Sequence, residues 1–204
     1  MTSETKWKLV SVDDYLSSEL VASIKHEYLG GMVYAMAGAR NAHNVVAGNI
    51  FASLHAKLRG QPCRPFNSDT KIRIRLPTHA RFYYPDASVI CRPNPQTDSF
   101  QDEPAVIFEV VSRGTRRVDQ GEKKDAYLTI PSLCVYVLVE QESPALVAFR
   151  RTERGFVSQE VHGLAATLPL EEVGTSLLLA DIYDGVEFTP EPDEPEERPA
   201  RPDL

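Results

Sequence analysis

Apolar side chains recur at helical spacing in residues 42–58, which predicts a long helix. Gly60 follows this stretch and supplies a stop signal. A short helix is expected over residues 11–20, because Ser11 can cap the first turn and the acids that follow favour the positive end of the helix dipole. A third helix is expected from about residue 118 to 128, ending before a proline that cannot continue it.

Alternating or continuous apolar runs predict the strands. Residues 26–37 are expected to form two strands around Gly30 and Gly31, because both glycines tolerate the positive φ of a hairpin turn. The run 105–111 is apolar enough to lie at the centre of a sheet that is covered on both faces. Further strands are expected at residues 72–76, 87–91, 133–139, 146–150 and 156–161, with a loop at 92–104. The expected fold class is therefore α/β, a mixed β-sheet flanked by helices.

The length of 204 residues suits one well-buried domain, which we assign to residues 1–189. Residues 190–204 are rich in proline and glutamate, a composition that is expected to stay disordered as an acidic tail. The rest of the chain has the composition of an ordinary globular protein, with 42% hydrophobic and 25% charged residues overall.

The sequence argues against membrane, secreted and zinc-binding classes. The longest apolar run, residues 133–139, is far shorter than the roughly 20 residues that span a bilayer. No apolar signal segment is visible at the N-terminus, so a cytoplasmic protein is expected. The three cysteines, Cys63, Cys91 and Cys134, are widely spaced and odd in number, and we expect reduced, buried thiols.

The net charge of −7 counts against a nucleic-acid partner, which usually requires a basic surface. Part of this charge lies in residues 190–204, which hold six acids and two arginines, so residues 1–189 carry 23 acids and 20 bases, a net charge of −3. Basic residues cluster locally, and a local positive field can suffice to bind phosphate. They are Lys71, Arg73, Arg75, Arg113, Arg116, Arg117, Lys123 and Lys124. The alternation over residues 71–75 fits a solvated strand face equally well.

Glu109 is an acid inside the otherwise apolar run 105–111. An ionised carboxylate taken out of water costs several kcal/mol unless a cation, a metal ion or hydrogen-bond donors compensate it. Asp86 and Lys123 are the candidates that we expect to lie beside it. Mg²⁺ is usually bound by oxygen ligands such as carboxylates. A metal ion beside a lysine can activate a water and stabilise the negative charge that develops when a phosphodiester is hydrolysed.

Asp119, Lys123 and Tyr127 are spaced four residues apart and are expected to share one face of a helix. Lys124 would then point about 100° away from that face. Asp119 could hold Lys123 in position, with Tyr127 packing below the pair. An ordinary surface ion pair between Asp119 and Lys123 remains the alternative.

Five short motifs in order complete the pattern, and the set resembles the PD-(D/E)xK nuclease superfamily, most closely its Uma-type branch of restriction endonucleases, over about residues 11–188. They are Glu27-Tyr28-Leu29-Gly30-Gly31-Met32 with His43 downstream, Ser68-Asp69-Thr70-Lys71, Tyr84-Pro85-Asp86, Glu109-Val110-Val111-Ser112, and Asp119-x-x-x-Lys123-x-x-x-Tyr127. One departure from the superfamily is Val111, which stands where a lysine is expected. In the branch that this chain resembles, that lysine has moved to the next helix, at Lys123.

The resemblance implies a restriction-endonuclease-like fold and a Mg²⁺-dependent endonuclease acting on DNA, with Mn²⁺ as a substitute cofactor. Asp86, Glu109 and the carbonyl of Val110 would hold the metal ion, and Lys123 would orient the attacking water. Glu27 would be a further metal or water ligand, and His43 a phosphate contact or acid–base group. A supporting role is implied for Asp119. DNA contacts are expected at Arg113, Arg116, Arg117 and Lys124, and a homodimer would suit the cleavage of two strands.

Blander alternatives remain for several of these residues and for the function. A lone histidine at a helix start, such as His43, is more often a capping or surface residue, and Asp69 suits turn chemistry equally well. A nuclease-like fold could serve as a binding or regulatory module without catalysis. A sugar hydrolase using Asp86 and Glu109 as an acid–base pair would work without metal.

Overall fold

The structure is a computed structural model that describes residues 9–112 and 119–188. The helices are α1 (Val12–Glu19), α2 (Asn41–Lys57), α4 (Lys124–Leu128) and α5 (Leu179–Ile182), with a π-helix η1 (Asp119–Lys123) and a 3₁₀ helix η2 (Glu171–Val173). The strands are β1 (His26–Leu29), β2 (Met32–Ala35), β3 (Arg64–Asn67), β4 (Lys71–Arg75), β5 (Ala80–Tyr83), β6 (Ala87–Ile90), β7 (Phe100–Gln101), β8 (Pro104–Val111), β9 (Val135–Glu140), β10 (Ala145–Thr152), β11 (Gly155–His162), β12 (Thr167–Leu170) and β13 (Thr175–Leu178).

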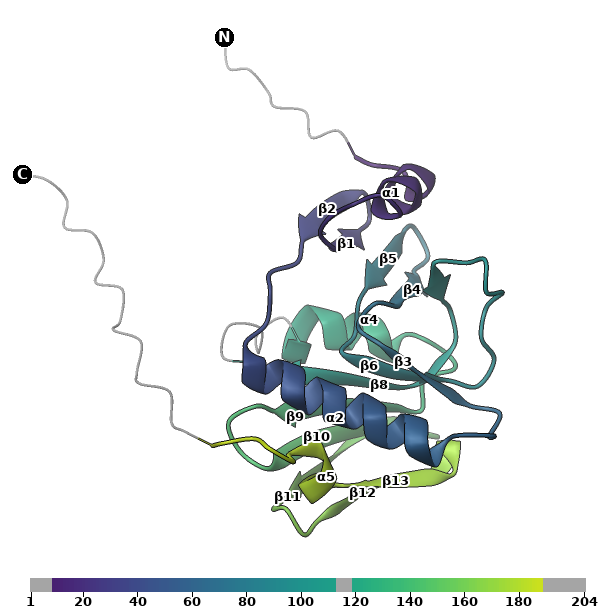
Figure 1. The fold of residues 1–204 in the computed structure, drawn as a ribbon. Helices are drawn as coiled ribbons and strands as arrows, with labels where there is room; N and C mark the ends of the chain where they lie inside the picture. Colours follow the sequence, from purple (N-terminus) through teal and green to yellow (C-terminus); the bar gives the residue numbers. More distant parts are fainter. Residues whose placement is uncertain (1–8, 113–118, 189–204) are drawn as a thin grey trace, which may run out of the picture.

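The strands form two large sheets and one small one (Figure 1). The first has the order β2-β1-β5-β4-β7, and the second has the order β11-β10-β9-β8-β6-β3. Strands β12 and β13 pair separately. Parallel pairing occurs between β8 and β9 and between β4 and β7, so both large sheets are mixed.

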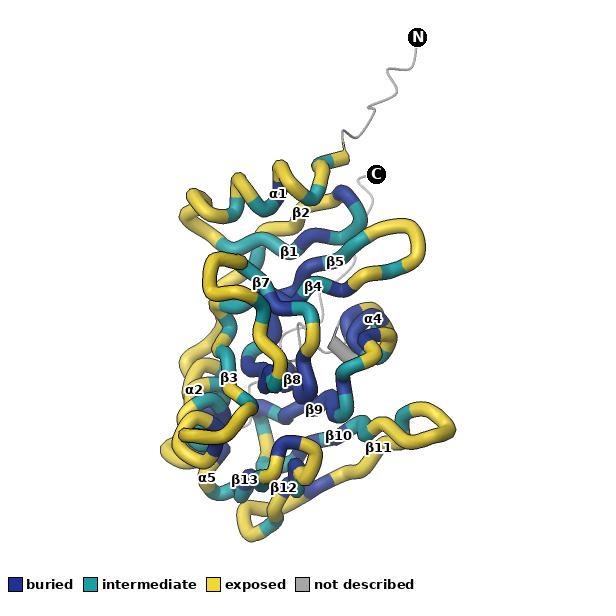
Figure 2. The backbone as a smooth tube through the Cα atoms, turned by 90° about the vertical axis from the view of Figure 1, so that its right-hand side faces the viewer, coloured by how far each residue is buried: buried dark blue, intermediate teal, exposed yellow. Residues whose placement is uncertain are grey.

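The six-stranded sheet lies between α2 and α4, which cover opposite sides of β8 in Figure 2. Residues of β8 alternate between these sides: Val106, Phe108 and Val110 join the core beneath α2, while Ile107 and Val111 join the core beside α4. The second core also includes residues of the five-stranded sheet, whose other face packs on α1. Strand β8 is thus buried along its whole length, as its apolar sequence predicted.

Local sequence signals account for the elements around the site. The side chain of Ser11 accepts a hydrogen bond from the Asp14 amide at 3.1 Å and caps α1 as expected. Gly30 and Gly31 have φ values of +59° and +105° and form the predicted hairpin turn between β1 and β2. Gly60, with φ of +78°, follows the end of α2. The predicted α/β class is confirmed.

One expected helix is present with a different geometry in its first turn, and one expected loop contains a short strand. The helix expected from about residue 118 to 128 begins, in its described part, as the π-helix η1 and becomes α-helical only at Lys124. Gly121 lies inside η1, and glycine is a weak α-helix former. The loop expected at residues 92–104 contains β7, a two-residue strand beside β4.

The expectation of three reduced cysteines was wrong for two of them. Cys63 and Cys91 form a disulfide, and Cys134 is a free thiol. The cause is the pairing of β3 with β6, whose last pair, Arg64 with Ile90, adjoins both cysteines. Their separation of 28 residues hides this contact in the sequence.

Among the residues with described positions, none of the helices is long and apolar enough to cross a membrane. The expected tail, residues 190–204, lies outside the described residues.

Candidate active site

Strands β6 and β8 are neighbours inside the six-stranded sheet and bring Asp86 and Glu109 close together at the start of β6. The two strands run antiparallel with Ala87 opposite Phe108, and one further step along this register places Asp86 opposite Glu109. Asp86 Oδ2 also accepts a hydrogen bond from the Val110 amide at 2.7 Å, which fixes this carboxylate against β8. The juxtaposition expected from the sequence therefore occurs, through neighbouring antiparallel strands.

Glu109 is buried, with 4% of its surface exposed, among the apolar residues of β8. The Nζ atom of Lys123 lies 3.8 Å from Glu109 Oε1. A buried carboxylate needs such a counter-charge, because removal of an ion from water is unfavourable by several kcal/mol. The lysine supplied by η1 thus takes the place beside Glu109 that the sequence assigned to it.

Lys123 also forms an ion pair with Glu27, whose Oε1 lies 2.8 Å from its Nζ atom. Strand β1 alternates, so that Tyr28 packs under α1 and Glu27 points to the opposite face of the sheet, toward η1. The sequence had suggested Asp119 as the residue that positions Lys123, but the side chain of Asp119 lies outside the described part of the structure. Glu27 also contacts Lys123, across 96 residues of sequence.

His43 lies in the first turn of α2 and contacts Asp86. Its Nε2 atom is 3.2 Å from Asp86 Oδ2, and both side chains are 14% exposed. Arg40, not His43, is the N-cap residue of the helix, and it makes no side-chain capping hydrogen bond. The histidine therefore contacts a candidate metal ligand, and the capping alternative does not describe it.

The aromatic rings of Tyr83, Tyr127 and Tyr136 pack on one another beside the candidate site. Tyr127 is fully buried, and its ring centroid lies 5.5 Å from that of Tyr83 and 5.6 Å from that of Tyr136. Burial raises the pKa of the Tyr127 hydroxyl well above its ordinary value, and the negative charges of Glu109 and Glu27 raise it further. The hydroxyl therefore stays neutral and adds no charge to the site. The ring of Tyr83 also faces Lys123, with the Nζ atom 5.5 Å from its centroid.

The described residues give this site an excess of negative charge. Glu27, Asp86 and Glu109 contribute three carboxylates, against the ammonium of Lys123 and the titratable His43. No three His, Cys, Asp or Glu side chains within residues 9–112 and 119–188 are close enough together to bind a metal ion by themselves. This donor set still fits Mg²⁺, which is usually held by one or two carboxylates and completes its shell with water and substrate phosphate.

A family model described as "Putative restriction endonuclease" matches residues 12–180 of the chain. The chain belongs to this Uma2 family. Two uncharacterized proteins of Synechocystis sp. are similar to it: slr1290, 31% identical over 88% of this chain and 94% of its own length, and sll1609, 31% identical over 66% of this chain and 76% of its own length.

A solved structure with the same fold is the crystal structure of "a putative nuclease belonging to DUF820" from Anabaena variabilis. The two structures superpose with a TM-score of 0.65 over 85% of this chain and 97% of the other, at 13% sequence identity. The Uma2 membership supports a nuclease, and the structural likeness shows a restriction-endonuclease-like fold.

The structure of this Uma2-family chain brings together five of the predicted site residues: Glu27, His43, Asp86, Glu109 and Lys123. Other predicted residues lie elsewhere. Lys124 points away, with its Nζ atom 5.1 Å from the centroid of the Phe149 ring. Arg113, Arg116 and Arg117 lie outside the described residues, so their role as DNA contacts remains a prediction.

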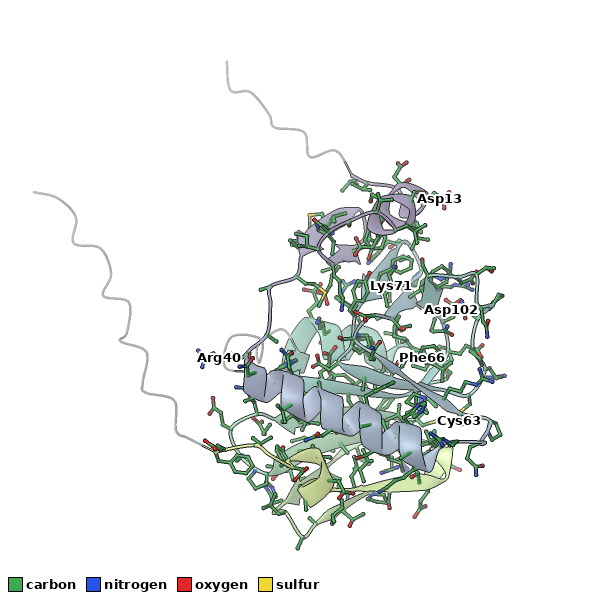
Figure 3. All side chains as sticks on the ribbon, viewed as in Figure 1. Asp13, Arg40, Cys63, Phe66, Lys71 and Asp102 are labelled. Atoms are coloured by element: carbon green, nitrogen blue, oxygen red, sulfur yellow. A yellow bond between two sulfur atoms is a disulfide. The ribbon has the colours of Figure 1, made fainter. Side chains whose placement is uncertain are left out.

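A cavity of about 1010 Å³ lies apart from this site, between the C-terminal end of α2, β3 and the segment 93–101. Its lining includes Tyr84, two residues before Asp86. Lys71, labelled with Phe66 in Figure 3, lines it and donates a hydrogen bond to the Tyr84 hydroxyl at 3.1 Å, which in turn donates to Glu19 at 2.9 Å. Burial lowers the pKa of Lys71, and Glu19 partly opposes this. This chain of hydrogen bonds anchors the segment that carries Asp86.

Sequence analysis missed Tyr83 and Arg81 near the site. Arg81 donates a hydrogen bond to the Tyr83 hydroxyl at 3.1 Å and forms an ion pair with Glu122 of η1 at 2.9 Å. The signal was available, because Tyr83 precedes the Tyr84-Pro85-Asp86 motif and faces the opposite side of β5 from Phe82.

Proposed function

We propose that this Uma2-family protein is a Mg²⁺-dependent endonuclease that hydrolyses phosphodiester bonds in DNA, with Mn²⁺ as a substitute cofactor. The observation that carries the proposal is the meeting of Asp86 and Glu109 on paired strands with Lys123 Nζ 3.8 Å from Glu109. Two carboxylates and a lysine that lie close together are the groups that a metal-assisted attack on a phosphate needs.

The carboxylates of Asp86 and Glu109 and the carbonyl of Val110 would hold the metal ion. When bound, Mg²⁺ supplies positive charge that polarises a phosphate oxygen and makes a water more acidic. The hydrogen bond from the Val110 amide keeps one oxygen of Asp86 in place, so the second oxygen can turn toward the ion. His43 restrains the same carboxylate from the side of α2.

Lys123 would orient the attacking water and stabilise the negative charge that develops on the phosphate. Its ammonium has three donors, and Glu27 occupies one side of it at 2.8 Å. The rings of Tyr83 and Tyr127 exclude water from behind the lysine, which strengthens its electrostatic effect. Glu27 thus acts as a positioning residue for Lys123.

The remaining assignments belong to the same proposal. Arg113, Arg116, Arg117 and Lys124 would contact the phosphates of DNA beyond the scissile bond. A homodimer would present two sites to the two strands of a duplex, and the enzyme would work in the cytoplasm.

Cleavage of supercoiled plasmid DNA by the purified protein tests the proposal. Wild-type protein with Mg²⁺ should nick or linearise the plasmid, and both EDTA and Asp86→Asn should abolish cleavage. Asp98→Asn, a change of an exposed aspartate away from the site, is the matched control and should cut like wild type. Equal cleavage by Asp86→Asn would contradict the proposal. Tight DNA binding without cleavage would favour a binding module, and metal-independent cleavage would exclude the assigned metal role.

A further inference from the structure

Strand β2 exposes apolar side chains at the open edge of the five-stranded sheet. All four of its residues are exposed, including Tyr34 at 46% and Val33 at 39%. The hydroxyl of Tyr34 lies 3.5 Å from the sulfur of Met32, a weak interaction that leaves the ring face uncovered. Grouped apolar side chains at a surface usually mark a binding site.

The register of the hairpin places Tyr34 beside the candidate active site. Tyr34 pairs directly with Glu27, and opposed residues of an antiparallel pair point to the same face, with Cβ atoms about 5 Å apart. Glu27 is the residue that contacts Lys123 at 2.8 Å. Val33 pairs with Tyr28, whose ring packs under α1, so Val33 points to the opposite face.

The chain after β2 leads from Tyr34 to the other side of the candidate site. In Figure 1 the segment that follows β2 descends to the start of α2, where Arg40, labelled in Figure 3, precedes the helix. Three residues later, His43 contacts Asp86. A single stretch from Tyr34 to His43 thus runs from the Glu27 side of the site to the Asp86 side.

We propose that Tyr34 is a stacking platform for an unpaired base next to the scissile phosphate, so that the substrate is single-stranded or locally unpaired nucleic acid. An exposed aromatic ring can stack on any base, but only if that base has left the duplex stack. The net charge of −7 weakens attraction to the phosphate backbone, and stacking supplies affinity that salt does not screen. This inference rests on the proposed function and adds its substrate class.

Fluorescence anisotropy with a labelled oligonucleotide of about 16 nucleotides, single-stranded or annealed, tests the inference. Ca²⁺ replaces Mg²⁺, so that binding is measured without turnover. Tyr34→Ala should weaken binding of the single strand roughly 5- to 150-fold, the equivalent of about 1 to 3 kcal/mol, and leave duplex binding unchanged. Tyr34→Phe, which keeps the ring, should bind as wild type does. A single strand carrying 5-iodouracil should crosslink under ultraviolet light to the peptide that contains Tyr34.

Val33→Ala is the matched control, because it shortens a similarly exposed side chain on the opposite face of the same strand, and it should bind like wild type. The inference is overturned if Tyr34→Ala binds the single strand normally, if it loses duplex binding equally, or if Val33→Ala shows the same loss. A wild-type dimer that both variants disrupt would show that a second copy covers β2, and would also overturn it. If the wild-type protein neither binds nor cuts either substrate, the proposed function is overturned as well. If the wild-type protein cuts DNA and Tyr34→Ala binds and cuts as wild type does, only this inference is overturned.

Discussion

Glu109 shows how far a single residue can be interpreted from sequence. An acid within an apolar strand required a counter-charge, and Lys123 was identified as the candidate. The structure places the two 3.8 Å apart. The resemblance pointed to Glu27 only as a further metal or water ligand. Its contact with Lys123 was not predicted, because it depends on how the first hairpin packs against η1, a long-range arrangement without a local signal.

We predict that Lys123→Ala reduces plasmid cleavage about 10²- to 10³-fold, because loss of one preorganised charge typically raises the barrier by about 3 to 4 kcal/mol. Metal binding should persist, since the carboxylates remain. Lys124→Ala is the comparison variant: this neighbouring lysine lies over Phe149 and away from the site, and as a proposed phosphate contact it should lower cleavage far less. Cleavage rates of the two variants decide the matter, and an equal loss in both would show that these lysines act only through general attraction of DNA.

The contact between Glu27 and Lys123 predicts a coupled effect. Glu27→Gln should slow cleavage by itself, because the neutral amide holds the ammonium less firmly. In a Lys123→Ala background the same change should have little further effect, since the positioned group is gone. The control cycle combines Glu27→Gln with Lys124→Ala and should be additive. Additivity in the Lys123 cycle would place Glu27 in a role independent of the lysine.

At the scale of elements, the sequence predicted correctly those features whose conformation depends on neighbouring residues alone. The Gly30–Gly31 hairpin and the Ser11 cap follow from the preferences of those residues alone. The pairing of Cys63 with Cys91 did not, because it depends on contact between distant segments. The register of β6 on β8, which brings Asp86 to Glu109, was expected only through the order of motifs.

Strand β4 gives a prediction about pH. Arg73 donates two hydrogen bonds of 2.7 Å to Asp102 and so clamps β4 to the segment before β8. Burial alone would raise the pKa of Asp102, but the hydrogen bonds from Arg73 and Asn94 and the charge of Arg73 outweigh it and lower the pKa. A lowered pKa contributes stability above the unfolded value of about 3.9, and this contribution disappears as the pH falls through the folded value.

Asp102→Asn should therefore reduce the free energy of unfolding by about 1 to 2 kcal/mol at pH 7. The difference between wild type and variant should shrink below about pH 4, where Asp102 becomes protonated in the unfolded chain while the folded protein still keeps it ionised. Urea unfolding at several pH values measures it. A difference that stays constant down to pH 3 would mean that the ion pair contributes nothing to stability.

At the scale of the whole molecule, composition alone would have argued against a nucleic-acid enzyme. The chain carries a net charge of −7, of which residues 190–204 contribute −4. A nuclease needs its positive charge only where the phosphate binds, and an acidic remainder reduces affinity through long-range repulsion. The sheet order that builds the site is likewise a global property, because it joins strands that are far apart in the sequence.

Deletion of residues 190–204 should strengthen DNA binding, and most at low salt, where repulsion is least screened. A full-length protein in which the six acids of this segment are replaced by their amides is the control for length, and it should behave like the deletion. Anisotropy titrations across a salt series measure the effect. Unchanged affinity at low ionic strength would show that this segment has no electrostatic influence on binding.

The central claim is that Asp86 and Glu109 form a divalent-metal site beside Lys123. Calorimetric titration with Mn²⁺ tests it without relying on turnover. Wild-type protein and Lys123→Ala should both bind the ion, whereas Asp86→Asn and Glu109→Gln should each lose binding while remaining folded by circular dichroism. Equal Mn²⁺ binding by wild type and both carboxylate variants would contradict the account.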